Sequence, residues 1–179
     1  MQRGGKDGFE HLACTANSRV GSESVKLLGA FALIVAICGC EKAPQQYLAD
    51  ARVDLADTVY DDAIVAAEAG LQANPDATTS WGLELVKLEA HARAGQAQEA
   101  KDQLARLADL HPNRVPASEY SATAYQLKSA GEGSAAIEVL DMGASVFPYD
   151  PVIGRMIEQS KTGSDPAELE MLRSLGYVE

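Results

Sequence analysis

After Gln46, apolar and polar residues recur with the spacing of α-helices rather than that of β-strands. The first such stretch has an apolar residue every three or four positions, as on one face of a helix, at Leu48, Ala51, Leu55 and Val59. No stretch alternates at a period of two over a useful length, which a half-buried strand would require. The pattern therefore predicts an all-α chain in which short polar breaks separate the helices.

Three later segments share one spacing of alanine, apolar residue and proline. In each segment an apolar residue follows the alanine by four positions and a proline follows it by twelve. The three sets are Ala63, Ala67 and Pro75; Ala100, Leu104 and Pro112; and Ala136, Leu140 and Pro148. Residues four apart share one helix face, and proline ends a helix. The spacing therefore predicts that a similar helix pair recurs three times.

This spacing resembles the second helix of the tetratricopeptide repeat, which has a period of about 34 residues and an A-x₃-F…P signature. The resemblance covers residues 46–150 and implies about three antiparallel helix pairs stacked as a short superhelix. The first helices are less similar, because none carries the full aromatic and glycine pattern of that family. The alternative is an unrelated helical bundle.

Residues 151–179 are predicted to form helices that cap the stack. Asp150 and Asp165 can each cap a helix whose first turn begins with proline. Glu168 is predicted to complete a reciprocal capping box with Asp165, and Gly176 to end the last helix in a left-handed conformation. A polar outer face of this kind closes the end of a repeat stack.

Near the start of the chain, residues 27–40 carry no charge and follow Lys26. This run is shorter than the ~20 residues that span a bilayer, and it has the length of a signal-peptide core. It ends on an aliphatic residue, two small residues and a cysteine: Ile37, Cys38, Gly39 and Cys40. The alternative is a buried helix of a soluble protein, but such a helix would show a polar face.

The ending of this run resembles the lipobox of bacterial lipoproteins. The resemblance implies that residues 1–39 are a signal peptide, that cleavage falls between Gly39 and Cys40, and that Cys40 then carries acyl chains such as palmitate. Cys38 is a departure, since alanine or serine is more usual there. Residues 1–24 form a long polar leader, so we expect either a mis-assigned start or a disordered extension. Residues 40–45 would be the tether to the membrane.

The charge and the cysteine content of residues 40–179 limit the kinds of partner that this part of the chain can bind. The chain has 15 basic residues, four of them before position 40, and 26 acidic residues, three of them before position 40. Residues 40–179 therefore carry 11 basic and 23 acidic residues, which give a net charge of −12. Such a chain repels nucleic-acid phosphates and anionic lipids, so we expect no nucleic-acid partner and attachment to a membrane only through the acyl chains. No cysteine follows Cys40, which excludes disulfides in residues 41–179.

No catalytic or metal-binding pattern is evident in residues 40–179. The two histidines, His91 and His111, have no cysteine, histidine or carboxylate at metal-ligand spacing. The motifs of serine hydrolases, zinc proteases and phosphate-binding loops are absent. We therefore expect no enzyme activity, no cofactor and no bound metal.

Two sets of residues are candidates for partner contact. One is a run of carboxylates spaced 4, 3 and 4 apart, which would form a stripe on a continuous helix: Asp50, Asp54, Asp57 and Asp61. A break between helices is expected around residues 57–60, so the stripe is either a solvated face or a docking surface for a basic partner. The other set is aromatic, since aromatic residues dominate binding hot spots: Trp81, Tyr120 and Tyr125. Each could equally belong to the core.

The first helices carry few of the basic and amide side chains with which some tetratricopeptide repeats hold a C-terminal carboxylate. Their groove is therefore expected to take apolar or amphipathic segments.

Together these observations predict a membrane-anchored lipoprotein that faces the periplasm from the bacterial outer membrane. It would act as a protein-interaction scaffold or assembly factor for other envelope proteins. The alternatives are a self-associating structural subunit and, less favoured, an enzyme or small-ligand binder.

Overall fold

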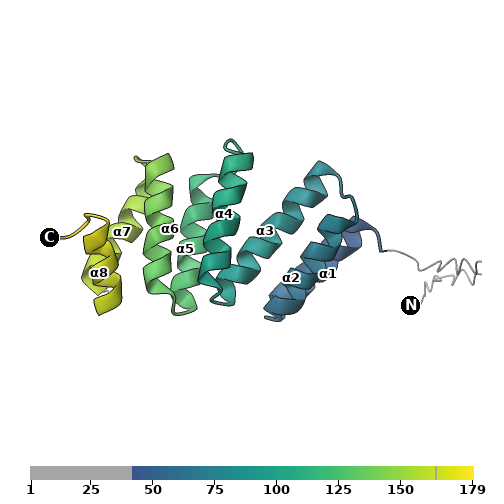
Figure 1. Cartoon of the computed structure of the whole chain (residues 1–179), viewed down its shortest axis with the longest axis horizontal. Helices are drawn as coiled ribbons and strands as arrows, with labels where there is room; N and C mark the ends of the chain where they lie inside the picture. The colour runs from purple at the N-terminus through teal and green to yellow at the C-terminus, as the bar shows by residue number, and fades with distance from the viewer. Residues whose placement is uncertain (1–41, 164) are drawn as a thin grey trace, which may run out of the picture. The chain divides into compact units, whose positions relative to one another are not determined.

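The computed structural model describes residues 42–163 and 165–179, and within them every regular element is an α-helix (Figure 1). The prediction of an all-α fold is confirmed. The helices are α1 (Pro44–Ala56), α2 (Tyr60–Gln72), α3 (Ala77–Arg93), α4 (Ala97–Leu110), α5 (Ala117–Ser129), α6 (Gly133–Val146), α7 (Pro151–Gly163) and α8 (Pro166–Ser174).

Successive helices pair off and the pairs stack in a row, as Figure 1 shows. The pairs are α1 with α2, α3 with α4, α5 with α6, and α7 with α8. Each described helix packs only against helices one or two places along the chain, so α1 contacts α3, α3 contacts α5 and α5 contacts α7. This nearest-neighbour packing is typical of stacked repeats, and it confirms the predicted arrangement of stacked helix pairs.

The chain turns within each of the first three pairs through one residue in the left-handed conformation. These residues are Thr58 (φ 64°), Gly95 (φ 72°) and Gly131 (φ 94°). The next amide donates a hydrogen bond to the carbonyl five positions back, over 2.8 Å from Val59 to Asp54, 2.9 Å from Gln96 to His91 and 2.9 Å from Glu132 to Leu127. This is the Schellman arrangement, which satisfies the last carbonyls of a helix.

The turns between pairs begin where a proline prevents the second helix of the preceding pair from continuing. Asn74, His111 and Phe147 each precede a proline and leave the right-handed helical region, with φ of 54°, −138° and −124°. A residue before proline avoids the helical conformation because it clashes with the proline ring. Asp76 and Asp150 then cap the following helices, each accepting two backbone amides.

Two predictions about the ends of the stack are wrong. The predicted boundary at residue 45 between tether and first helix is too late, because α1 begins at Pro44, where proline fits the first helical turn. The Asp165 carboxylate accepts a hydrogen bond from the backbone amide of Glu168 at 2.9 Å, but the Glu168 carboxylate accepts none from the backbone amide of Asp165. It lies buried 3.5 Å from Nζ of Lys128 on α5, because α8 packs against the preceding pair. Gly176 has φ 81° and ends α8 as predicted.

A tyrosine on the first helix packs against a glycine on the second helix in two of the pairs. A Cβ on Gly70 would lie 2.8 Å from Cβ of Tyr47, and one on Gly143 would lie 2.9 Å from Cβ of Tyr120. In both pairs the tyrosine stands 16 positions before the repeated alanine and the glycine stands seven after it. Such close approach requires a residue without a side chain.

The second pair fills the same two places differently. Glu84 replaces the tyrosine, and it accepts a hydrogen bond from Nε2 of Gln103 at 2.6 Å and an ion pair from Arg106. Leu107 replaces the glycine and is buried. The pair therefore combines a largely buried polar network with a leucine in its core.

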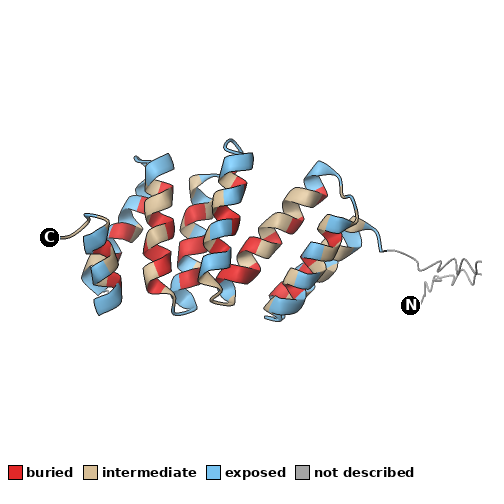
Figure 2. Cartoon of the chain, viewed as in Figure 1, coloured by how far each residue is buried: buried red, intermediate tan, exposed pale blue. Residues whose placement is uncertain are grey.

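The core consists of two clusters that meet on α3. Leu83, Val86 and Ala90 belong to the cluster formed with α1 and α2, whereas Leu88 and Ala92 belong to the cluster formed with α4 to α7. Figure 2 shows the buried residues on the faces between neighbouring helices. Because α3 is covered on two sides, it joins the first pair to the rest of the stack.

Replacing Ala100 with phenylalanine should lower the free energy of unfolding by roughly 1–3 kcal/mol, because overpacking a filled core displaces its neighbours. Ala100 is 0% exposed and lies in the larger cluster. Urea unfolding of residues 42–179 measures the change. The same substitution at Ala122, which is exposed on α5, is the control and should shift the midpoint little. An unchanged midpoint for the Ala100 variant would mean that this position has room.

Candidate functional site

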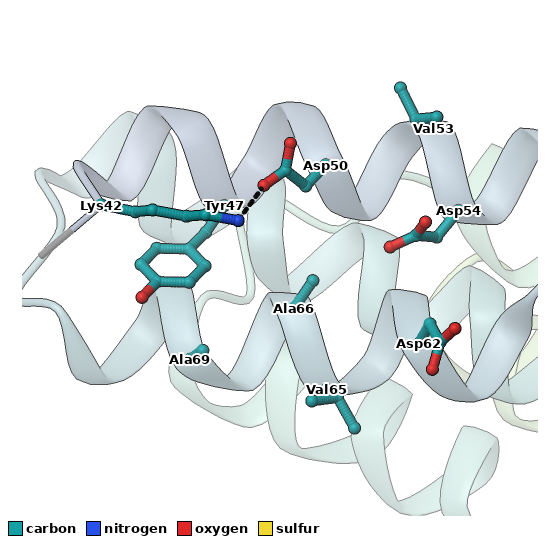
Figure 3. Close-up of a pocket in the computed structure, with 9 residues that line it drawn as sticks. All are labelled: Lys42, Tyr47, Asp50, Val53, Asp54, Asp62, Val65, Ala66 and Ala69. Atoms are coloured by element: carbon teal, nitrogen blue, oxygen red, sulfur yellow. Dashed lines mark hydrogen bonds and ion pairs between the residues drawn. The ribbon is translucent and has the colours of Figure 1, made fainter.

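A groove of about 500 Å³ runs between α1 and α2 (Figure 3). Every lining residue belongs to these two helices or to the two positions before α1, so the groove opens away from α3. Its lining comprises Lys42, Tyr47, Asp50, Val53, Asp54, Asp62, Val65, Ala66 and Ala69. The groove therefore presents aliphatic side chains and carboxylates side by side.

The charges in the groove divide between its two ends. Lys42 and Tyr47 lie at one end and Asp54 and Asp62 at the other, as Figure 3 shows. Nζ of Lys42 lies 2.9 Å from the carboxylate of Asp50, and this hydrogen bond raises the pKa of Lys42. Within the described residues, no ion pair engages Asp54 or Asp62. One end of the groove thus carries two carboxylates that are available to a cation.

The apolar part of the groove is also accessible. Val53 on α1 and Val65 on α2 are both exposed, and Ala66 and Ala69 are half-buried between the helices. Small side chains leave space for the side chains of a bound segment. The arrangement suits a segment that combines aliphatic residues with lysine or arginine.

The predicted carboxylate stripe is divided by the turn at residues 57–59. Asp50 and Asp54 line the groove, whereas Asp57 lies in the turn after α1. Asp61 lies on α2 but faces the second pair, where it accepts a hydrogen bond from Nε2 of Gln96 at 3.3 Å. Asp62, which the stripe prediction did not include, takes the third place in the groove.

The sequence prediction also missed Lys42, Tyr47, Val53 and Val65 as site residues. A helical projection would have shown part of the groove, because Asp50, Val53 and Asp54 share one face of α1. The facing side chains of α2 could not be found in this way, since their place depends on how the two helices pack.

Tyr120 is not a surface anchor. It is 2% exposed and its ring centroid lies 6.0 Å from that of Phe147, within the larger core cluster. Burial, followed by the charge of Asp109, raises the pKa of Tyr120. The prediction that it contacts a partner is wrong, because the close approach of α6 at Gly143 covers the ring.

Tyr125 and Trp81 are accessible to different degrees. Tyr125 on α5 is 68% exposed and borders a hollow of about 330 Å³ together with Tyr60 and Arg93. Trp81 on α3 is half-buried: the guanidinium of Arg114 lies 4.4 Å from its ring centroid and His111 meets it edge-on at 5.6 Å. Tyr125 therefore remains the better exposed of the predicted aromatic contacts.

The described residues give no sign of a metal centre. Among residues 42–163 and 165–179, no three histidine, cysteine, aspartate or glutamate side chains lie together as metal ligands would. His91 is buried, and its Nδ1 lies 2.6 Å from Oε1 of Gln96, which shows a structural role in the α3–α4 turn. Gly39 and Cys40, the predicted cleavage and acylation sites, lie outside the described residues.

Comparison of the chain with protein-family models, curated proteins and solved structures finds no match. Within the described part of the chain, none of the helices has the length and apolar character needed to cross a bilayer.

Proposed function

We propose that this chain is a bacterial lipoprotein, anchored by Cys40, whose tetratricopeptide-like stack binds other proteins of the cell envelope. The observation that carries the binding role is the groove between α1 and α2. It is open, it sets exposed valines beside carboxylates, and two of those carboxylates have no ion pair among the described residues. Binding surfaces are distinguished by accessible apolar side chains in a shaped depression.

Support for the repeat type comes from the first helices. The tetratricopeptide pattern begins W-x₂-L-G, with an aromatic residue followed four positions later by a small one. Tyr47 is followed by Ala51 and Tyr120 by Ala124, and both alanines are buried. These residues stand at matching distances before Ala63 and Ala136. The first and third pairs therefore carry part of the first-helix pattern as well as the second-helix pattern.

Support for the anchor comes from the sequence around Cys40. An uncharged run preceded by lysine ends there on the lipobox-like residues, and the charged residue Glu41 follows at once. Helix α1 begins at Pro44, four positions after Cys40. Cleavage before Cys40 would thus leave a short tether and an intact helical stack.

The groove chemistry indicates a basic amphipathic segment as the partner. The half-buried Asp54 and the exposed Asp62 attract lysine or arginine, and Val53 and Val65 give an apolar contact beside them. Complementary charge of this kind mainly sets the rate and specificity of association.

Changing both Asp54 and Asp62 to asparagine should lower the affinity for such a partner about 2- to 30-fold, since exposed charge pairs contribute about 0.2–1 kcal/mol each. Capture from detergent-solubilised envelope, with the variant and the unchanged protein compared at low and high salt, measures this. The difference should shrink as salt screens the exposed charges.

The matched control changes Asp57 and Asp61 to asparagine. It removes the same charge from the same helix pair, but from residues outside the groove. An equal loss in both variants would show that net charge, and not the groove, attracts the partner. Capture of only further copies of the chain would favour the structural-subunit alternative, and a bound small molecule would favour a ligand-binding role.

A further inference from the structure

The three turns that join successive pairs lie along one edge of the stack (Figure 1). These turns are residues 73–76, 111–116 and 147–150, and we call this side the inter-pair edge. The turns within pairs, at residues 57–59, 94–96 and 130–132, lie along the opposite edge. The alternation follows from the antiparallel order of the helices.

Side-chain contacts connect the inter-pair edge from one pair to the next. Nε2 of Gln45, at the start of α1, donates to the carboxylate of Asp76 at 3.1 Å. Trp81, in the first turns of α3, meets His111 at 5.6 Å. Tyr120, in the first turns of α5, meets Phe147 at 6.0 Å. The beginning of α1 therefore lies on the same edge as the three turns.

Several exposed apolar side chains lie on this edge, whereas the exposed Val59 and Tyr125 lie toward the opposite edge. Leu110 and Val146 end α4 and α6, Val152 lies in the first turn of α7, and all three are exposed. Tyr149, in the turn between α6 and α7, is 95% exposed. Val146, Tyr149 and Val152 surround the one turn at residues 147–150, and an exposed apolar patch of this kind marks an interaction site.

The two edges differ in charge as well. The inter-pair edge carries the exposed cations Arg114 and Lys42, of which Lys42 is paired with Asp50, and its carboxylates Asp76 and Asp150 are engaged in capping backbone amides. Asp109 is its further exposed carboxylate. The opposite edge and the helix turns beside it hold most of the acidic side chains of the first three pairs that have no hydrogen bond or ion pair among the described residues: Asp57, Asp62, Glu99 and Glu132.

We propose that the inter-pair edge rests on the phospholipid surface that holds the anchor, with Tyr149, Val146, Val152 and Leu110 at the headgroup level. The proposal depends on the acylation of Cys40 put forward above. Four residues from Cys40 to Pro44 span at most about 14 Å when extended, so the anchor holds the start of α1, and with it this edge, close to the bilayer.

The chemistry of the edge fits a lipid surface. Tyrosine is enriched at membrane interfaces because its ring is apolar and its hydroxyl is hydrated, and lysine and arginine interact with lipid phosphates. In this orientation the acidic edge points away from the bilayer, where it meets the least electrostatic repulsion. The groove carboxylates Asp54 and Asp62 then lie at the end of the groove that is farther from the membrane.

The test is a fluorescent label placed on either edge of the acylated protein. In the processed chain the thiol of Cys40 is consumed by the lipid thioether, so Tyr149→Cys or Ala130→Cys supplies the one reactive thiol. Both positions are exposed turn residues flanking α6, and the 14 residues of this helix separate them by about 20 Å. The labelled proteins are reconstituted in phosphatidylcholine vesicles that contain a nitroxide-bearing lipid as quencher.

We expect strong quenching at position 149 and no quenching at position 130. Val152→Cys, a second position on the inter-pair edge, should behave like position 149. Equal quenching on both edges, stronger quenching at position 130, or none at any position would overturn the orientation. An intact mass without acyl chains would overturn the anchor and the orientation with it, and it distinguishes that failure from an anchored protein with a different face on the lipid.

Discussion

Replacing Tyr120 with alanine should lower the free energy of unfolding of residues 42–179 by about 3–5 kcal/mol, the range for truncating a buried aromatic side chain. Tyr120 is 2% exposed, and its ring fills the space between Gly143 on its own partner helix and Phe147 in the following turn. Because the glycine has no side chain to move into the gap, the cavity would remain. Urea unfolding followed by circular dichroism measures the loss.

Tyr125→Ala is the control for this change. It removes the same side chain from the same helix, but from a position that is 68% exposed, where substitutions usually change stability by less than about 0.5 kcal/mol. A similar loss for both variants would show that α5 is sensitive to any truncation. No loss for Tyr120→Ala would mean that the third pair does not close around the ring.

Replacing Cys40 with serine should abolish acylation and release the chain from the membrane fraction, or leave it unprocessed at Gly39. The thioether on which the proposed anchor depends cannot form on a serine side chain. Labelling cells with palmitate and fractionating the envelope measures both effects. Anchoring by acyl chains scales with the apolar length inserted, and within the described part of the chain no helix could replace it by spanning the bilayer.

Cys38→Ser provides the matched control. It also removes one thiol from the same short stretch, but it leaves the acceptor at Cys40 and places serine where lipoboxes usually have a small residue. This variant should be acylated and membrane-bound. Palmitate that persists in the Cys40→Ser protein would contradict the assignment of the anchor, and loss of label in both variants would show that processing depends on Cys38.

The order of the helices and the turns between them can be predicted from local sequence signals. Pro75, Pro112 and Pro148 end the second helix of each pair because proline constrains the residue before it. Gly95 and Gly131 mark two of the left-handed turns, and Asp150 caps α7 as expected. Prolines, glycine turns and helix caps each act within about five residues, so they can be recognised from neighbouring positions in the chain.

Which faces of the helices are covered depends instead on how the helices pack against one another. Tyr120 and Tyr125 lie on one helix only five positions apart, yet the first is buried and the second exposed. The difference arises because Gly143, 23 positions further along, lets α6 approach the first ring. Periodicity distinguishes the faces of a helix but not which of them a later helix will cover.

Helix packing also explains which carboxylates line the groove between α1 and α2. Asp54 and Asp61 are both carboxylates in the predicted stripe, but the turn at residues 57–59 sends Asp61 toward Gln96 and brings Asp62 opposite Asp54. Likewise Glu168 belongs by local rules to a capping box, but the packing of α8 places its carboxylate beside Lys128. Local sequence fixed where each helix begins and ends, whereas the burial of side chains between helices, an interaction among distant residues, fixed what the surface offers to a partner.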